Sequence, residues 1–415
     1  MKIQIVKSSS GIEAWLVEAH AEPMMALRFA FDGGSSQDPP RKEGLAGFLA
    51  AMLKEGAGRS NAQEFQERML DLSMRMGFGR SRDVFFGSLE TLSQNRDQAA
   101  ELLRLALAEP RFDAEAVERT RQRMLASIAQ EARSPNDVAA AQWDAAAFPA
   151  HPYGRPGGGT QESVASISVD DLDSYRKRVL AKDTLRVVAV GDITPDDLRS
   201  LLDHVFADLP ACAELFPVPK ADPVAGARQM VIDMDVPQSV AVFGMGAIPR
   251  EDPDYIAAFM LNHIVGGGGA SKLMDEVRAK RGLAYGVSTT IATSRHISII
   301  RGGVATRNDM MGESLNVIRA ELQKMASGNI SQTDLDNAKS YLIGSYPLQF
   351  DTNAKVASQL LGLRVTGFGP EYIETRSALI AAVTLDDLKR VAKRLLDTSN
   401  LIVTVVGRPM LQKAS

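Results

Sequence analysis

Two stretches of the chain carry the same succession of hydrophobic and polar positions. Each begins with acidic residues, continues with apolar residues at helical spacing, and closes with a β-branched run before a glycine. This succession predicts a helix, a short turn and a strand. The stretches are Val169–Gly191 and Leu385–Gly407, in which ten of the 23 aligned positions are identical. A repeat at nearly half the chain length predicts two homologous domains.

Further signals mark where helices begin. Ser168 and Thr384 each stand three residues before an aspartate, which is the spacing of a capping box. Near the front of each half, Ala46–Gly56 and Ala257–Gly267 are similar to each other and predict apolar helices that end in glycine. In the first of these helices, one face carries only small residues, Gly47, Ala50 and Ala51. Such a face is unusual for a helix in contact with water, where charged residues are expected.

A proline-rich segment separates the two halves. Residues 209–226 contain four prolines and show no clear period, which is typical of a linker. We therefore expect an N-terminal domain over residues 1–208, a linker over 209–226 and a C-terminal domain over 227–415. The second domain is expected to begin with an extended stretch, Arg228–Ala247.

Composition excludes several classes of protein. Hydrophobic residues make up 45% and charged residues 24% of the 415 residues, as in globular proteins. The net charge of −4 argues against a dedicated nucleic-acid binder. No apolar run approaches the ~20 residues that cross a bilayer, so no membrane span is expected. Cys212 is the single cysteine, which excludes an internal disulfide and a thiolate metal cluster.

Common catalytic motifs are missing from the sequence. No two of the five histidines lie within one helical turn, so the chain has no local H-x-x-E-H pair. There is no G-x-S-x-G nucleophile motif either. The run Gly266–Gly269 lacks the pattern of a phosphate-binding loop. It can be a flexible turn between helices, or a loop that lets a peptide backbone approach closely.

An arginine and a tyrosine after the glycine run are candidates for binding. The spacing predicts a helix over Ala270–Lys280 and a strand from Leu283 to about Ile291. Arg278 then lies on the last helical turn and Tyr285 enters the strand, so both can point into one cleft. Their N–H and O–H groups are donors that can hold a substrate carbonyl or a developing oxyanion. The alternative is a surface arginine and a core tyrosine.

Together these stretches resemble the pitrilysin-like zinc peptidases, in particular the branch of mitochondrial processing peptidase and its bacterial relatives. Gly44–Met52 aligns with the family motif G-L-A-H-F-L-E-H-M, and the resemblance covers essentially the whole chain. Gly268–Leu273 and Gly282–Tyr285 follow the family's C-terminal signature. There, Arg278 and Tyr285 take the places of an arginine–tyrosine pair that contacts substrate opposite the metal.

The same alignment implies that the metal site is vacant in this chain. The family's two histidine ligands fall on Gly47 and Ala51, its general-base glutamate falls on Ala50, and its third ligand, a glutamate, falls on Ser127. The resemblance therefore implies no metal and no cofactor in this chain, which would be inactive alone. The family's edge-strand pattern N-A-x-T-S-R-D is matched only in its tail by Gly77–Asp83, which implies that this strand no longer pairs with a peptide.

The resemblance implies a role in a two-chain enzyme. A sister subunit with an H-x-x-E-H motif would hold zinc, and the heterodimer would hydrolyse peptides or unfolded segments. This chain would bind substrate through Arg278 and Tyr285, with Gly267, Gly268 and Gly269 close to the peptide. The alternative is a purely structural subunit of the same fold that takes no part in cleavage. An enzyme of unrelated mechanism in the vacant pocket has no support in the sequence.

The repeat and the resemblance together predict the fold. We expect two α+β domains, each an antiparallel sheet with helices packed on one face, arranged as a clamshell. Related bacterial pairs act in the periplasm, so we expect that compartment if a leader peptide has been removed. The cytoplasm is the alternative, because no leader is visible in the sequence.

Overall fold

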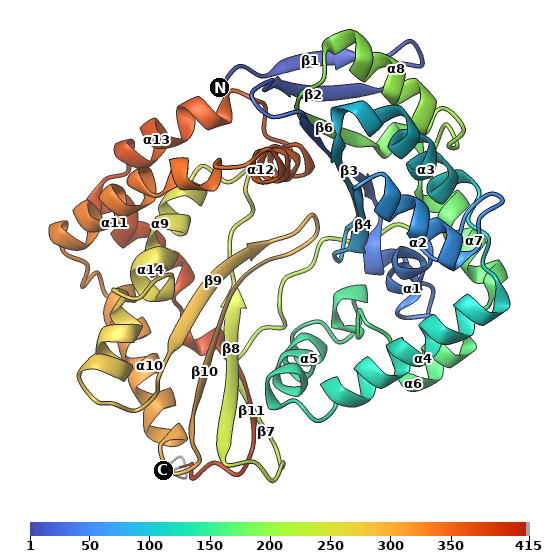
Figure 1. Ribbon diagram of the computed structural model, residues 1–415. Helices are drawn as coiled ribbons and strands as arrows, with labels where there is room; N and C mark the ends of the chain where they lie inside the picture. The colour runs from blue at the N-terminus through green and yellow to red at the C-terminus, as the bar shows by residue number, and fades with distance from the viewer. Residues whose placement is uncertain (412–415) are drawn as a thin grey trace. The chain divides into compact units, whose positions relative to one another are not determined.

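The computed structural model describes residues 1–411 and contains two sheets (Figure 1). Contacts divide the chain into two compact units, each built around one sheet. The first sheet has the strand order β1-β2-β6-β3-β5-β4 and the second has the order β7-β11-β8-β10-β9. The predicted fold class, two α+β domains, is confirmed. The strands are β1 (Gln4–Lys7), β2 (Glu13–Glu18), β3 (Met24–Asp32), β4 (Arg75–Arg80), β5 (Val84–Leu92), β6 (Arg186–Gly191), β7 (Arg228–Ile232), β8 (Gln238–Gly246), β9 (Val287–Thr293), β10 (Ser298–Arg307) and β11 (Ile402–Val406).

Helices surround both sheets. They are α1 (Leu45–Met52), α2 (Ala62–Asp71), α3 (Arg96–Ala108), α4 (Ala114–Glu131), α5 (Pro135–Ala147), α6 (Gln161–Ser166), α7 (Val169–Val179), α8 (Pro195–Phe206), α9 (Tyr255–Gly266), α10 (Met311–Ala326), α11 (Gln332–Gly344), α12 (Asn353–Val365), α13 (Tyr372–Ala382) and α14 (Leu385–Leu395), with a short π-helix over Met274–Ala279. Short 3-10 helices cover Gly34–Gln37, Ser93–Asn95, Pro152–Gly154, Lys182–Thr184, Tyr346–Gln349 and Thr398–Asn400.

The sequence repeat occupies the same place in both units. Helix α7 leads to β6 in the first unit, and α14 leads to β11 in the second. The capping boxes at Ser168 and Thr384 are both present. Strand β6 pairs in parallel with β2 and antiparallel with β3, and β11 pairs in the same way with β7 and β8. Each sheet is therefore mixed, whereas the sequence predicted two antiparallel sheets.

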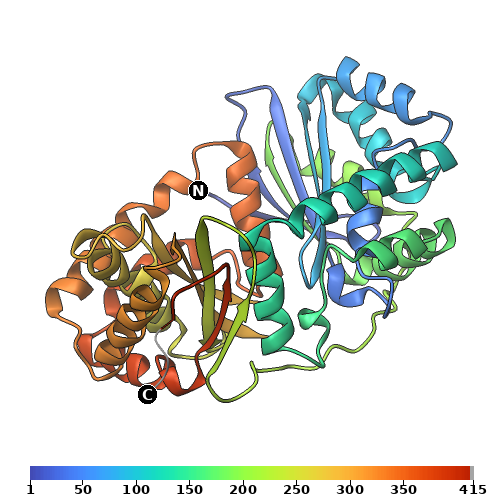
Figure 2. The ribbon, with the colours of Figure 1, turned by 90° about the horizontal axis from the view of Figure 1, so that it is seen from below.

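One helix in each unit comes from the other half of the sequence. The first unit includes residues 346–372, whose helix α12 packs on β6 and β3. The second unit includes residues 130–155, whose helix α5 packs on β8 and β11 (Figures 1 and 2). Ala139, Trp143 and Ala147 of α5 are buried there with strand residues of the second unit. Helices thus cover both faces of each sheet, whereas the sequence predicted one covered face. The proline-rich residues 209–226 form neither helix nor strand.

The other face of each sheet carries the larger core. In the first unit this core includes side chains of α1, α3, α7 and α8. In the second unit it includes side chains of α9, α10 and α14. This packing places α1 and α9 at equivalent positions, as the similarity of their sequences predicts. Among residues 1–411, no helix has the length and apolar character needed to cross a membrane.

Candidate functional site

Two distant parts of the sequence meet at a pocket in the first unit. Ala51 of α1 and Ser127 of α4 both line a cavity of about 250 Å³. The cavity is completed by residues from the turn after α1 and from α4: Lys54, Glu55, Thr120, Arg123 and Met124. The structure therefore brings together two of the positions to which the alignment assigns metal ligands.

Strand β4 places an arginine beside the first of these positions. A Cβ atom at Gly47 would lie 3.4 Å from Nε of Arg80. A side chain at this position would therefore lie against the Arg80 guanidinium. Glycine and alanine offer no ligand atom, and a guanidinium beside the site opposes a divalent cation. The residues present do not fit zinc, and among residues 1–411 no group of three or more His, Cys, Asp or Glu is placed to hold a metal ion.

A double ion pair ties the two helices of this pocket together. Glu55, just after α1, accepts hydrogen bonds from Arg119 and Arg123 of α4, each at 2.7 Å. Burial raises the pKa of the Glu55 carboxyl, but the hydrogen bonds from the two arginines outweigh it and leave that pKa below its ordinary value. Arg123 also donates to Oγ1 of Thr120 at 2.8 Å. The pocket wall is therefore held by ionised groups at neutral pH.

In the second unit, Arg278 and Tyr285 lie together. The guanidinium carbon of Arg278 is 4.7 Å from the centre of the Tyr285 ring, which is a cation–π contact. Arg278 lies in the π-helix and Tyr285 is 86% exposed. The prediction that Tyr285 enters a strand is wrong, because β9 begins two residues later, at Val287. The tyrosine lies in the loop before the strand, where its hydroxyl is open to solvent.

The glycine run follows α9 and borders a large hollow. Gly266–Gly269 line a cavity of about 710 Å³, together with residues of β8, β9 and β10. At Gly266 a Cβ atom would lie 2.5 Å from Oγ1 of Thr289, so glycine lets the end of α9 approach β9. At Gly269 a Cβ atom would meet nothing within 4 Å. The predicted turn between helices is thus present, and at its last glycine, Gly269, there is space for a side chain.

Strand β9 is an edge strand whose outer backbone groups have poor partners. The N–H of Val287 donates to Sδ of Met274 at 3.5 Å, and the carbonyl of Thr289 accepts from Nδ2 of Asn262 at 3.4 Å. Residues two apart in a strand direct their backbone groups to the same side. Thioether sulfur is a weak acceptor, and 3.4 Å is long for a hydrogen bond. Side chains therefore cover this edge of β9, but they give its backbone groups weaker hydrogen bonds than a neighbouring strand would.

Two buried polar atoms at the same edge have no partner. In the part of the chain that the structure describes, Oδ1 of Asn262 and Oγ1 of Thr289 make no hydrogen bond, and both residues are buried. Buried polar atoms without partners cost free energy and are rare in folded proteins. The contact between α9 and β9, next to the glycine run, is therefore less favourable than it would be if both atoms had hydrogen-bond partners.

The fold and the two sites define a class of protein: a two-domain peptidase-like chain without a metal-binding residue set in its first unit. The family model described as "Insulinase (Peptidase family M16)" matches residues 15–161, and "Peptidase M16 inactive domain" matches residues 166–342. The chain belongs to peptidase family M16, and it is a non-catalytic member.

Relatives and solved structures agree with this assignment. A Helicobacter pylori protein named "Non-peptidase homolog YmxG" is 25% identical over 397 residues, which cover 95% of this chain and 92% of that protein. The beta subunit of a probable mitochondrial-processing peptidase from Arabidopsis thaliana is 23% identical and is matched over 73% of its length, covering 91% of this chain. The crystal structure of a peptidase M16 inactive domain from Pseudomonas fluorescens has a TM-score of 0.92 at 26% identity, with both chains fully covered.

Several residues of these sites were not predicted from the sequence. Arg80 lies where the strand pattern departs from the family, but the sequence does not reveal that it reaches Gly47. Asn262 had a usable signal, because it is a polar residue inside an apolar helix. Lys54, Met274 and Thr289 carried no signal, since their importance comes from neighbours distant in sequence.

Proposed function

We propose that this chain is the substrate-binding, non-catalytic subunit of a two-chain zinc metallopeptidase that hydrolyses peptides or unfolded segments. The observation that carries the proposal is the exposed pair of Arg278 and Tyr285. The pair lies just before β9, an edge strand whose outward backbone groups make only weak hydrogen bonds. The sister subunit would hold the zinc ion, which activates water and polarises the peptide carbonyl. This chain would bind and orient the peptide.

The chemistry of the pair suits that role. Arg278 offers several N–H donors in a rigid plane, and Tyr285 offers one O–H donor. Their cation–π contact restrains both side chains before substrate arrives, which lowers the entropy lost on binding. An exposed tyrosine that contributes little to a core is more readily explained by binding than by stability.

Strand β9 supports peptide binding by strand addition. A peptide backbone that pairs with the outer edge would replace the weak contacts of Met274 and Asn262 by ordinary backbone hydrogen bonds. The glycine run lies beside this edge and would let the peptide approach, which is the role predicted for Gly267, Gly268 and Gly269. By alternation, the N–H of Ile291 belongs to the same edge.

Co-expression with a sister chain that carries H-x-x-E-H tests the proposal. We expect cleavage of a long unstructured peptide only when both chains are present, with zinc only in the sister. Arg278→Ala and Tyr285→Phe should each lower kcat/KM by about tenfold or more, while Arg408→Ala, an exposed arginine elsewhere in the second unit, should not. Full activity of the sister alone, or no association of the two chains, would favour the purely structural role.

A second experiment tests the strand edge. Ile291→Pro removes an outward N–H but leaves the ladder to β10, because proline is tolerated on the open side of an edge strand. Ile291→Ala removes the same side chain and keeps the N–H. We expect peptide binding by the complex to weaken in the proline variant much more than in the alanine variant. Equal binding by both variants would exclude strand addition at β9.

A further inference from the structure

The pocket between α1 and α4 has a charge opposite to that of a metal-binding pocket. Lys54 and Arg123 both line it, and its single carboxylate, Glu55, is held by two arginines. The ammonium of Lys54 makes no hydrogen bond or ion pair among residues 1–411. Cations thus outnumber anions around a cavity that opens to solvent.

We propose that this pocket binds a carboxylate, supplied by a glutamate side chain of a peptide, at the place where the alignment assigns a zinc ion. Lys54 would make the new ion pair. Arg123 already donates to Glu55 and Thr120, so the free donors are few. Few donors suit a carboxylate of single charge better than a phosphate group, which takes up more of them.

The remaining walls suit the methylene groups of a glutamate. Met124 and Ala51 line the same cavity, so an apolar stem can pack beside the ammonium of Lys54. A volume of about 250 Å³ is several times the ~30 Å³ that one water molecule occupies in the liquid. The cavity therefore has room for a whole side chain. This site lies in the first unit and does not depend on Arg278, Tyr285 or a sister subunit.

Methyl NMR of Met124 in the full-length chain gives a local measurement. The protein is labelled at its methionine methyl groups, and the Met124 resonance is assigned with Met124→Leu. Two blocked pentapeptides are titrated, Ala-Ala-Glu-Ala-Ala and the same peptide with Gln in place of Glu. We expect the Glu peptide to shift the Met124 resonance and the Gln peptide to leave it in place. Raising the salt concentration should weaken the Glu peptide's binding.

Two variants and a metal titration make the test decisive. Lys54→Gln should weaken binding of the Glu peptide by about threefold to tenfold, the range for a partly exposed ion pair. Lys7→Gln, which removes an exposed lysine of β1 in the same unit, should not change it. Unchanged methyl spectra would show that both variants fold. Equal shifts from both peptides, no effect of Lys54→Gln, or a shift of Met124 on adding Zn²⁺ to the wild type would each overturn the proposal.

Discussion

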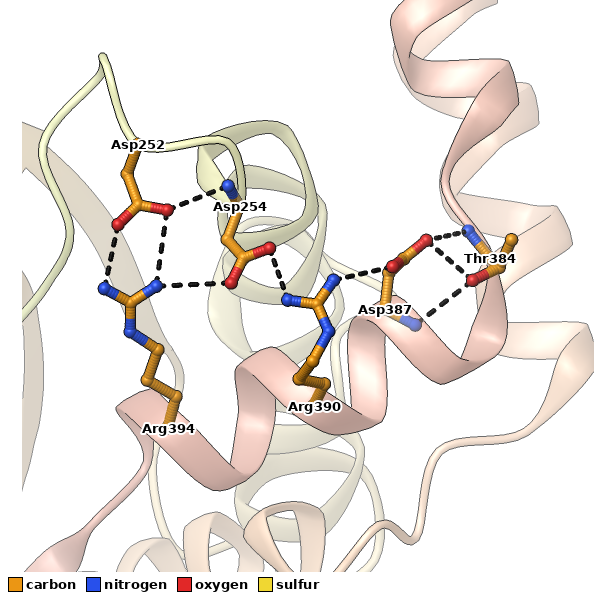
Figure 3. A network of polar contacts seen from close by, with 6 residues as sticks. All are labelled: Asp252, Asp254, Thr384, Asp387, Arg390 and Arg394. Atoms are coloured by element: carbon orange, nitrogen blue, oxygen red, sulfur yellow. Dashed lines mark hydrogen bonds and ion pairs between the residues drawn. The ribbon is translucent and has the colours of Figure 1, made fainter.

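Arg394 holds Asp252 across the second unit, with Nη2 of the arginine 2.8 Å from Oδ2 of the aspartate (Figure 3). The same guanidinium lies 3.2 Å from Oδ2 of Asp254. Arg390, one turn earlier, bonds Asp254 and Asp387. These contacts join α14 to the loop in which α9 begins, and α9 carries the glycine run at its other end. The network therefore positions the helix that leads to the candidate peptide site.

The first unit makes the equivalent contact with the charges reversed. Lys42, in the loop before α1, lies 2.7 Å from a carboxylate oxygen of Asp171 on α7. Helices α7 and α14 are the two copies of the repeat, and α1 corresponds to α9. In the first unit the loop supplies the cation, and in the second unit the loop supplies the anions. The helix–loop contact is thus common to both units, although the residues that make it are not.

Removing Arg394 should destabilise the second unit. Asp252 and Asp254 have side chains only 15% and 16% exposed. Arg394→Ala leaves the Asp252 carboxylate without its arginine partner, whereas Asp254 keeps Arg390. We expect a loss of about 1 kcal/mol in the free energy of unfolding. Urea unfolding followed by Trp143 fluorescence in a Trp15→Phe background measures it. Arg408→Ala, whose partners are 75% and 85% exposed, is the matched control and should change stability little. Equal losses in both variants would contradict the role given to the network.

The acid stability of the second unit should depend on Asp387. Hydrogen bonds from the hydroxyl and N–H of Thr384, and then from Arg390, lower the pKa of the Asp387 carboxyl from 3.8 to about 2. A carboxyl whose pKa is lower in the folded than in the unfolded state stabilises the fold fully at pH values above its ordinary pKa. This contribution to the free energy of unfolding is lost as the pH falls from about 4 toward 2. The stability difference between wild type and Asp387→Asn should therefore be present at pH 6 and shrink toward pH 2. A difference that is constant over this range would argue against the shift.

Two glycines of the run should respond differently to alanine. Gly266→Ala would place a Cβ atom 2.5 Å from Oγ1 and 2.7 Å from the backbone nitrogen of Thr289, so α9 or β9 must move. We expect a loss of about 1–3 kcal/mol in unfolding free energy. Gly269→Ala meets no atom within 4 Å and should stay within about 0.5 kcal/mol of wild type. Trp143 fluorescence again reports unfolding. A large loss at Gly269 would show that the far end of the run is packed.

Restoring the family's ligands should not by itself restore zinc binding. The fourfold variant Gly47→His, Ala50→Glu, Ala51→His and Ser127→Glu puts a side chain at Gly47 against Arg80. Adding Arg80→Thr removes both this contact and a nearby cation. We expect the fivefold variant to bind zinc at least about tenfold more tightly than the fourfold variant. Competition with a chromophoric chelator measures the affinities. Equal affinities would show that Arg80 does not obstruct the site.

Several expectations about function stay predictions. The heterodimer, the peptide substrate, the zinc in a sister chain and the compartment, periplasm or cytoplasm, are implied by the resemblance. The roles of Arg278 and Tyr285 also rest on it, although the structure places the two residues in contact. The co-expression experiment addresses the first three points together, because activity, zinc content and association are measured on the same complex.

Sequence by itself determined the features that local signals encode. The repeat, the capping boxes at Ser168 and Thr384 and the proline-rich segment all follow from residues within one or two turns of each other. The vacant motif on α1 follows from the family resemblance, and its three positions lie on consecutive turns of one helix. The short-range hydrogen bonds and apolar spacing that produce these features are visible in the order of the residues.

Tertiary structure alone decided the features that join distant segments. The parallel pairs β2–β6 and β7–β11, the packing of α5 and α12 on the sheets of the opposite halves, and the contact of Arg80 with Gly47 have no local signal. The charge of the pocket also belongs here, because Lys54 approaches it from the turn after α1 and Arg123 from α4. Burial and long-range packing choose such partners from many residues of the same type, so a single sequence does not specify them.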